Sequence, residues 1–294
     1  MNLRRGRYFL GRIVKINLDQ DMLMNALVHS PTISVGKFDW TVTDAVDNRD
    51  GVNRYVFGKL SKYAKDGHVT VIDEINRSQV DADAPNLLVA SSPFVYLPEF
   101  SGIAFLHVWD GIQEDVFPRR IQAIVEAAYD GLLVSCDVEP VTDYRAFTAR
   151  LRRLEKFTEI SATVYPPNPL FGRLWADLNE YIAQRNASEV SVKEQTSKPG
   201  GLKSKIVELM SNIMKSPDYQ PAVAPGISDA AILMAADGYG RGKVAGIEDG
   251  EEVEIKTSDN QKSFLFAKEP VPAELAAKTA ILFEKINIER DMAH

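Results

Sequence analysis

The sequence predicts an α+β protein in which mainly antiparallel sheets carry helices. Segments rich in β-branched and aromatic residues follow one another through the first half, with turn residues between them. The order of these segments fits antiparallel pairing with helices on one face better than a strict strand–helix alternation. The 294 residues also exceed the size of one small domain, so we expect two domains.

The first predicted domain covers residues 1–142 and consists mostly of strands. Asp50-Gly51, between two of these strands, is a favourable hairpin turn because glycine adopts positive φ without steric cost. An amphipathic helix over 121–130 and a strand over 131–141 complete the domain. The other predicted strands cover residues 7–18, 39–46, 52–64, 68–75, 86–98 and 103–109.

The second predicted domain covers residues 143–270 and contains the basic part of the chain. Thr142 or Asp143 can cap its first helix, and a later helix is expected to open near Gly200-Gly201. The predicted elements are helix 143–157, strand 160–166, helix 170–184, strand 188–195, the glycine-opened helix, and a meander over 230–236, 242–248, 251–257 and 262–268. The closing helix, within residues 271–294, is expected to pack back on the first domain.

Charge is distributed unevenly along the chain. Thirty-four Lys and Arg against 41 Asp and Glu give a net charge of −7, which argues against a uniformly basic nucleic-acid-binding coat. Residues 143–215 nevertheless hold 12 basic against 8 acidic side chains. Because salt confines a charge's field to about 10 Å, this local excess can still attract a polyanion.

The composition favours a cytoplasmic protein. Cys136 is the only cysteine, so neither a disulfide framework nor a cysteine-rich zinc site can form. No apolar run approaches the length of a membrane-spanning helix. The basic N-terminus does not read as a signal peptide, because Arg12 and Lys15 interrupt its apolar stretch.

Catalytic motifs are weak. The G-x-S-x-G and phosphate-loop patterns are absent, and His107 and Cys136 lie in apolar runs typical of buried strands. Glu254-Ile255-Lys256, with Asp237 or Asp249 upstream, matches the E-x-K element of metal-dependent nucleases, although any half-exposed strand shows the same alternation. We therefore predict a non-enzymatic protein with no catalytic residue, metal or cofactor, and keep a nuclease as an alternative.

Basic side chains in the second domain are the candidate binding residues. Lys198-Pro199-Gly200-Gly201 leads into a predicted helix, and helix N-termini attract phosphate oxygens. Lysines beside such an end would add attraction without sequence readout. The alternative interpretation is a loop kept soluble by its lysines. The candidates are Lys193, Lys198, Lys203, Lys205, Arg241, Lys243, Arg152 and Arg153.

Three short motifs occur in an order that resembles the RexA-like phage-exclusion proteins. They are Ile75-Asn76-Arg77-Ser78, Val138-Glu139-Pro140 before the arginine-bearing helix, and Pro169-Leu170-Phe171-Gly172 before the next helix. A strand ending at Lys193, a lysine-bearing helix, a meander and a closing helix follow. The family's basic residues in the first meander strand have no counterpart here, and Arg241 and Lys243 are the nearest substitutes.

The resemblance implies a homodimer with a mobile second domain that binds double-stranded DNA without sequence preference. It also implies a role in prophage-encoded anti-phage defence by abortive infection, with a small membrane protein as a possible effector partner. One alternative is an interaction module that recognises a phage protein, since most of the chain is acidic. The metal-dependent nuclease is the third hypothesis.

Overall fold

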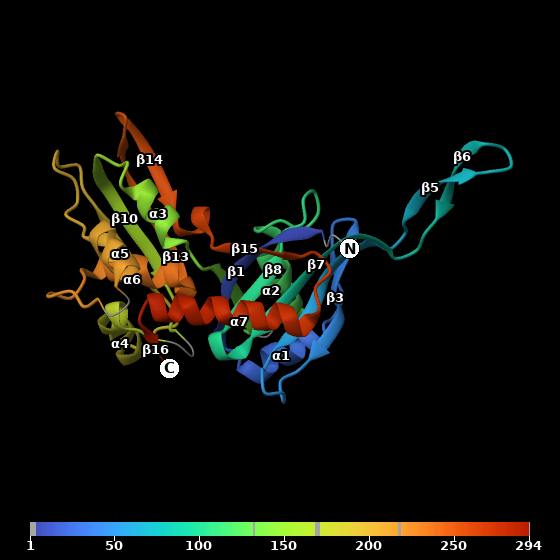
Figure 1. Ribbon diagram of the computed structural model, residues 1–294, viewed down its shortest axis with the longest axis horizontal. Helices are drawn as coiled ribbons and strands as arrows, with labels where there is room; N and C mark the ends of the chain where they lie inside the picture. The colour runs from blue at the N-terminus through green and yellow to red at the C-terminus, as the bar shows by residue number, and fades with distance from the viewer. Residues whose placement is uncertain (1–3, 132, 168–170, 217–218, 294) are drawn as a thin grey trace.

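The computed structural model describes residues 4–131, 133–167, 171–216 and 219–293. It confirms the predicted α+β class with mainly antiparallel sheets (Figure 1). No helix within the described residues has the length and apolar character needed to cross a membrane.

The larger sheet has eight strands and curls around two helices. Its order is β15-β1-β8-β7-β4-β3-β2, with β9 also paired to β1, and every pairing is antiparallel. The strands are β1 (Arg5–Ile16), β2 (Ile33–Val35), β3 (Phe38–Asp47), β4 (Val56–Ala64), β7 (Leu87–Leu97), β8 (Gly102–Leu106), β9 (Ser135–Pro140) and β15 (Ser263–Ala267).

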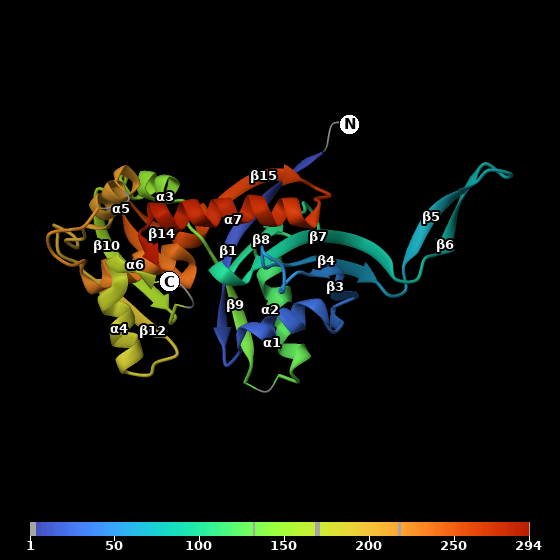
Figure 2. The ribbon, with the colours of Figure 1, turned by 60° about the horizontal axis from the view of Figure 1, so that its bottom comes forward.

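Helices cover both faces of this sheet. Helices α1 (Gln20–Val28) and α2 (Val116–Ala128) lie on one side, and α7 (Pro272–Glu289) lies on the other (Figure 2). The sequence did not lead us to expect α1, although Asp19 caps it by accepting a hydrogen bond from the Met22 amide.

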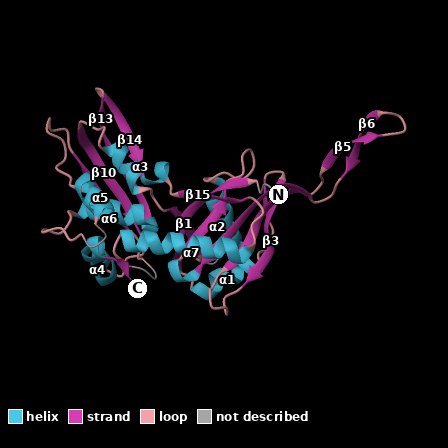
Figure 3. Ribbon diagram, in the orientation of Figure 1, coloured by secondary structure: helices cyan, strands magenta, loops and turns pink. Residues whose placement is uncertain are grey.

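The smaller sheet has the order β12-β10-β13-β14, with β10 (Lys156–Val164), β12 (Val190–Gln195), β13 (Gly240–Glu248) and β14 (Glu251–Lys256). Helix α6 (Ile227–Met234) packs against β10, β12 and β13, and α3 (Tyr144–Leu151) and α5 (Ile206–Lys215) lie beside it (Figure 3). The remaining elements are α4 (Ala176–Gln184), the β11 (Phe171–Gly172) and β16 (Met292–Ala293) pair, and the short helical turns η1 (Pro98–Phe100), η2 (Arg173–Trp175), η3 (Ala235–Tyr239) and η4 (Thr257–Asn260).

Two apolar clusters form the core. One lies between the larger sheet and helices α1 and α2. The other extends from Tyr8 of the larger sheet through Phe283 of α7 to Ile160 of the smaller sheet. Phe283 stacks on Phe100 at a centroid distance of 5.6 Å, so the closing helix packs on the first sheet as predicted. The division into domains at residue 142 stays a prediction.

A two-stranded arm, formed by β5 (His68–Asp73) and β6 (Ser78–Asp83), projects from the body (Figure 1). It continues β4 and β7, whose last pair is Ala64 with Leu87. No residue of the arm belongs to either core cluster. The arm therefore adds no apolar burial to the fold.

Two predicted elements of the second half are wrong. Residues 230–236, expected as a strand, belong to α6 and the turn η3, where all of them are buried and show no periodicity. Helix 143–157 is divided into α3, capped by Asp143, and the start of β10. Of the family-like Pro169-Leu170-Phe171-Gly172 motif, the first two residues lie outside the described residues.

Candidate functional site

Three of the predicted binding residues meet on the exposed face of the smaller sheet. Lys193 and Lys243 flank Ser161 on the two neighbouring strands, and Arg241 pairs with Thr163. These side chains line a cleft of about 720 Å³ whose other wall is formed by the start of α2 and by β9. We call it the central cleft.

Carboxylates neutralise the cations of the central cleft. Lys193 and Lys243 lie 2.9 and 3.1 Å from the Glu159 oxygens, and Lys243 lies 2.9 Å from Glu254. Hydrogen bonds from the two lysines hold the pKa of Glu159 below its usual value. These side chains lie together, but their charges are balanced locally.

Arg241 is also paired, and one of its partners is buried. Its guanidinium lies 2.8 Å from Glu139 and 3.3 Å from Asp137. Burial raises the pKa of Glu139 to about 7, against the opposing effect of Arg241. Arg241 therefore already has two carboxylate partners that a phosphate would have to replace.

The other predicted lysines lie apart from the central cleft. The Lys205 amide donates to Asp229 at the start of α6, and α6 covers the face of the sheet opposite Lys193. The side chains of Lys198, Lys203 and Lys205 are exposed. None of these three lysines is among the residues that line the central cleft with Lys193.

The predicted glycine-opened helix N-terminus is wrong. Helix α5 begins at Ile206 rather than near Gly200-Gly201, which lie in a turn. The Asp229 carboxylate accepts from Ser204 Oγ at 2.6 Å and from the Lys205 amide at 2.9 Å. A carboxylate already occupies the place where a phosphate was expected.

The two predicted arginines of the first basic helix are bonded within the protein. Arg152 donates to Ser211 Oγ at 2.7 Å, and Arg153 forms an ion pair with Glu248. Both lie just beyond the end of α3. Their contacts hold α3 against neighbouring elements.

Glu254 and Lys256 of the nuclease-like triplet do not form a metal site with the described acidic residues upstream. Glu254 pairs with Lys256 at 3.3 Å as well as with Lys243. Asp237 is buried, and both of its carboxylate oxygens accept hydrogen bonds from buried side chains. Among the described residues, no group of three or more Asp, Glu, His or Cys could hold a metal ion.

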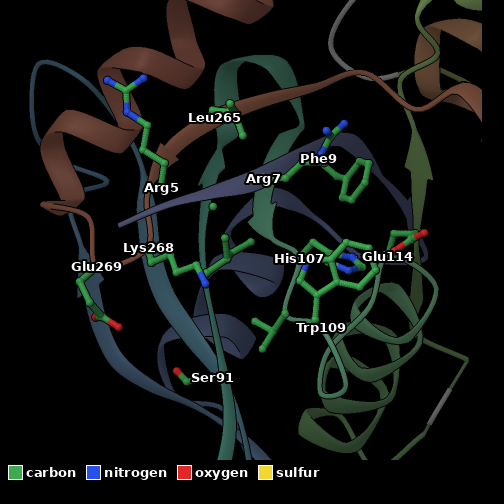
Figure 4. Close-up of a pocket in the computed structure, with 13 residues that line it drawn as sticks. Arg5, Arg7, Phe9, Ser91, His107, Trp109, Glu114, Leu265, Lys268 and Glu269 are labelled. Carbon is green, nitrogen blue, oxygen red and sulfur yellow. Dashed lines mark ion pairs between the residues drawn. The ribbon is translucent and has the colours of Figure 1, made fainter. Parts of the chain in front are cut away.

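A second hollow, of about 690 Å³, lies where β8 ends. Strand β8 stops at Leu106, opposite Tyr8, whereas β1 continues to Arg5 and β7 continues to Leu87. The gap leaves a space between the two longer strands (Figure 4). We call it the β8 hollow.

Cations without carboxylate partners surround the β8 hollow. Arg5 and Arg7 alternate along β1, and Lys268 follows β15, which pairs with β1. Arg4 lies beside them, because its carbonyl accepts from the Lys268 amide at 2.9 Å. In the part of the chain that the structure describes, no carboxylate lies within 4.0 Å of the charged groups of these four exposed residues. They form what we call the N-terminal cationic surface.

A row of rings leads from the core to the rim of this hollow. Phe105 lies 6.2 Å from Phe9, Phe9 lies 5.9 Å from His107, and His107 lies 4.5 Å from Trp109, measured between ring centroids. His107 Nδ1 lies 2.7 Å from a Glu114 oxygen but without hydrogen-bond geometry, so packing between Phe9 and Trp109 orients the imidazole. Trp109 is 79% exposed and stands across the hollow from Lys268 (Figure 4).

Sequence reasoning missed this site. Arg5 and Arg7 were considered only as part of a basic N-terminus, and Trp109 only as the end of a buried strand. The available signal was the alternation of Arg5, Arg7 and Phe9, which places two charges and a ring on one face of a strand. The buried positions of His107 and Cys136, by contrast, match the prediction.

Comparison with known proteins identifies no relative of this chain. No protein-family model matches the chain, and no curated protein has a similar sequence.

Proposed function

We propose that this protein binds DNA without sequence preference, through the N-terminal cationic surface of Arg4, Arg5, Arg7 and Lys268. One observation supports the proposal: these exposed cations have no carboxylate partner among the described residues. Contacts with phosphates give affinity that does not depend on base sequence.

By the same reasoning, we expect the central cleft to contribute less to DNA binding. Each cation there already has a carboxylate partner, so a phosphate would have to displace Glu159 or Glu139. Partly exposed ion pairs such as Lys193 with Glu159 contribute about 0–1 kcal/mol each. Displacing the buried Glu139 costs more, because its carboxylate would stay buried without a partner. At the N-terminal cationic surface a phosphate displaces no carboxylate of the described residues.

The test is a gel shift of mixed-sequence duplex DNA at about 50 mM salt, where phosphate contacts are strongest. The variant R5E/R7E is expected to bind about 10-fold or more weakly, and its salt-dependence slope should fall by about 2. The variant K203E/K205E carries the same charge change elsewhere and is the matched control. Absence of a shift with the unaltered protein would end the DNA proposal, and an equal loss in both variants would remove the assignment to the N-terminal cationic surface.

The biological setting that we propose follows from the resemblance stated above. In that setting a cytoplasmic homodimer binds duplex DNA and takes part in prophage-encoded phage exclusion, with a small membrane protein as effector. Phage plating on cells that express the unaltered chain or R5E/R7E tests it. Equal plating efficiency with the two chains, while R5E/R7E has lost DNA binding, would separate exclusion from DNA binding.

A second candidate function is the recognition of a phage protein by the projecting arm. Ile72 and Ile75 are exposed on it, Ile75 by 92%, and apolar side chains so placed favour a protein contact. The test is recovery of a phage protein from nuclease-treated, infected lysate by the unaltered chain but not by I72D/I75D. Equal recovery with both chains would exclude the arm.

A further inference from the structure

Trp109 differs from the other two tryptophans of the chain. Trp40 and Trp175 are 3% and 1% exposed, whereas Trp109 is 79% exposed at the rim of the β8 hollow. A large ring left in water forgoes the stabilisation that burial of its apolar surface would give. Such a ring in a hollow is therefore available to a ligand.

The surroundings of Trp109 hold its ring in place. Its edge-to-face partner His107 is packed against Phe9, and the His107 side chain is only 8% exposed. The turn that carries Trp109 is closed by the Val108 amide, which donates to the Ile112 carbonyl at 2.9 Å. A ring ordered before binding loses little conformational freedom when a ligand stacks on it.

The charges around the hollow indicate what kind of ring would stack there. Arg5, Arg7 and Lys268 line the same space and have no carboxylate partner among the described residues. Two glutamates also line it, but Glu114 lies against His107 and Glu269 forms an ion pair with Lys59. A volume of about 690 Å³ is within the range of sites that take small organic groups. A ligand with a flat ring joined to phosphates can stack its ring on Trp109 and place its phosphates against the cations. A nucleotide has both groups.

A base inside an intact duplex cannot use this ring. Its two faces are covered by the neighbouring base pairs, whereas an unpaired base exposes a face for stacking on an aromatic side chain. The ligand must therefore contain single-stranded nucleotides, as a separate strand, an overhang or a gap.

We propose that the β8 hollow binds single-stranded nucleic acid, with an unpaired base stacked on Trp109 and adjoining phosphates against Arg5, Arg7 and Lys268. This inference rests on the proposed function for its phosphate contacts and adds the form of nucleic acid that the site prefers. DNA and RNA strands share the required chemistry.

Tryptophan fluorescence tests the stacking directly, because Trp109 is the exposed tryptophan. The unaltered protein is titrated with oligo-dT and oligo-U of about 12 nucleotides, with an abasic strand of the same charge and with a blunt duplex. Oligo-dT or oligo-U is expected to quench the emission, and whichever binds more tightly identifies DNA or RNA as the source. The abasic strand and the blunt duplex are expected to bind without quenching.

Two variants separate the ring from the charges. W109L is expected to bind oligo-dT about 10-fold or more weakly, with no change in its affinity for the abasic strand. L265A alters another exposed apolar side chain of the same hollow and is the matched control, expected to bind as the unaltered protein does.

The outcomes distinguish the two proposals. The stacking inference is wrong if oligo-dT, the abasic strand and the duplex bind equally and W109L binds as tightly as the unaltered protein. If R5E/R7E alone then loses affinity, the proposal of DNA binding stands. If no nucleic acid binds, both proposals fail. Quenching that persists in W109L would also overturn the inference, because it would come from another tryptophan.

Discussion

Asp237 accepts three hydrogen bonds inside the core. Its carboxylate accepts from Tyr144 at 2.7 Å, from Trp175 at 2.8 Å and from Arg290 at 2.9 Å. The Arg290 guanidinium also lies over the Tyr144 ring, 3.9 Å from its centroid. These contacts connect η3 with α3, η2 and the end of α7, so one carboxylate positions four elements.

Arg12 is buried beside this cluster, and no carboxylate in the described part of the chain forms an ion pair with it. It donates to the carbonyls of Asp237 and Phe100 at 2.9 and 2.6 Å and to the Asn287 side chain at 3.1 Å. Burial lowers the pKa of Arg12, and the charge of Asp237 opposes that effect. Both buried arginines therefore depend on the position of Asp237.

The substitution Asp237→Asn is expected to destabilise the protein by about 3–5 kcal/mol, since it leaves Arg290 buried without a counter-charge. Its amide would also place a donor against the Tyr144 hydroxyl or the Trp175 N–H. In urea unfolding, the midpoint concentration of urea is expected to fall, while the dependence of the unfolding free energy on urea concentration stays the same. Asp249→Asn, in the exposed turn between β13 and β14, is the control, and an equal effect of the two substitutions would refute the argument.

Elements with one exposed face were predicted most accurately from the sequence. Strands β12 and β14 lie at or near the expected positions, and polar residues occupy their exposed faces. Strand β8 was predicted although all of its residues are buried, because its apolar run is short. Helix α6 was missed because it is buried all round, and an unbroken apolar run does not distinguish a helix from a strand. The alternation of polar and apolar residues distinguishes a helix from a strand only where one face of the element is exposed to solvent.

The arm is an element that the body does not need for its stability. An isolated two-stranded hairpin is marginally stable in water, and this one contributes nothing to the core clusters.

Joining Ala64 to Leu87 by a short glycine-containing turn is therefore expected to leave the free energy of unfolding within about 0.5 kcal/mol of its original value. Urea unfolding of the arm-deleted chain provides the measurement. A loss of several kcal/mol would mean that the arm supports the body. Amide hydrogen exchange gives an independent check, since arm amides should exchange much faster than those of β7.

At the scale of the whole molecule, the candidate site depends on contacts that no local pattern encodes. Strand β15 pairs with β1 although Leu265 and Arg7 are 258 positions apart, and Trp109 reaches the same hollow through β8. The sequence could predict which residues were charged or aromatic. It could not predict that Glu159 would neutralise Lys193 while none of the described carboxylates would reach Arg5. Long-range pairing determines which cations remain available.

The continuity of the core predicts how the chain unfolds. One apolar cluster extends from the larger sheet through α7 to the smaller one, so loss of either sheet exposes apolar side chains of this shared cluster. Urea unfolding followed by circular dichroism and by tryptophan fluorescence is therefore expected to give a single midpoint. Variants W40F and W175F, which remove one reporter from each cluster, should keep coincident curves for the two probes. Two separate midpoints would instead indicate independent domains on either side of residue 142.

The projecting arm also has a hydrodynamic consequence. It extends the long axis of the molecule while adding little mass, so friction rises faster than molecular weight (Figure 1). The protein should sediment more slowly than a compact sphere of 32.7 kDa and elute early in size-exclusion chromatography. An apparent mass taken from elution volume alone would then be too high, and light scattering is needed to count the chains in the particle.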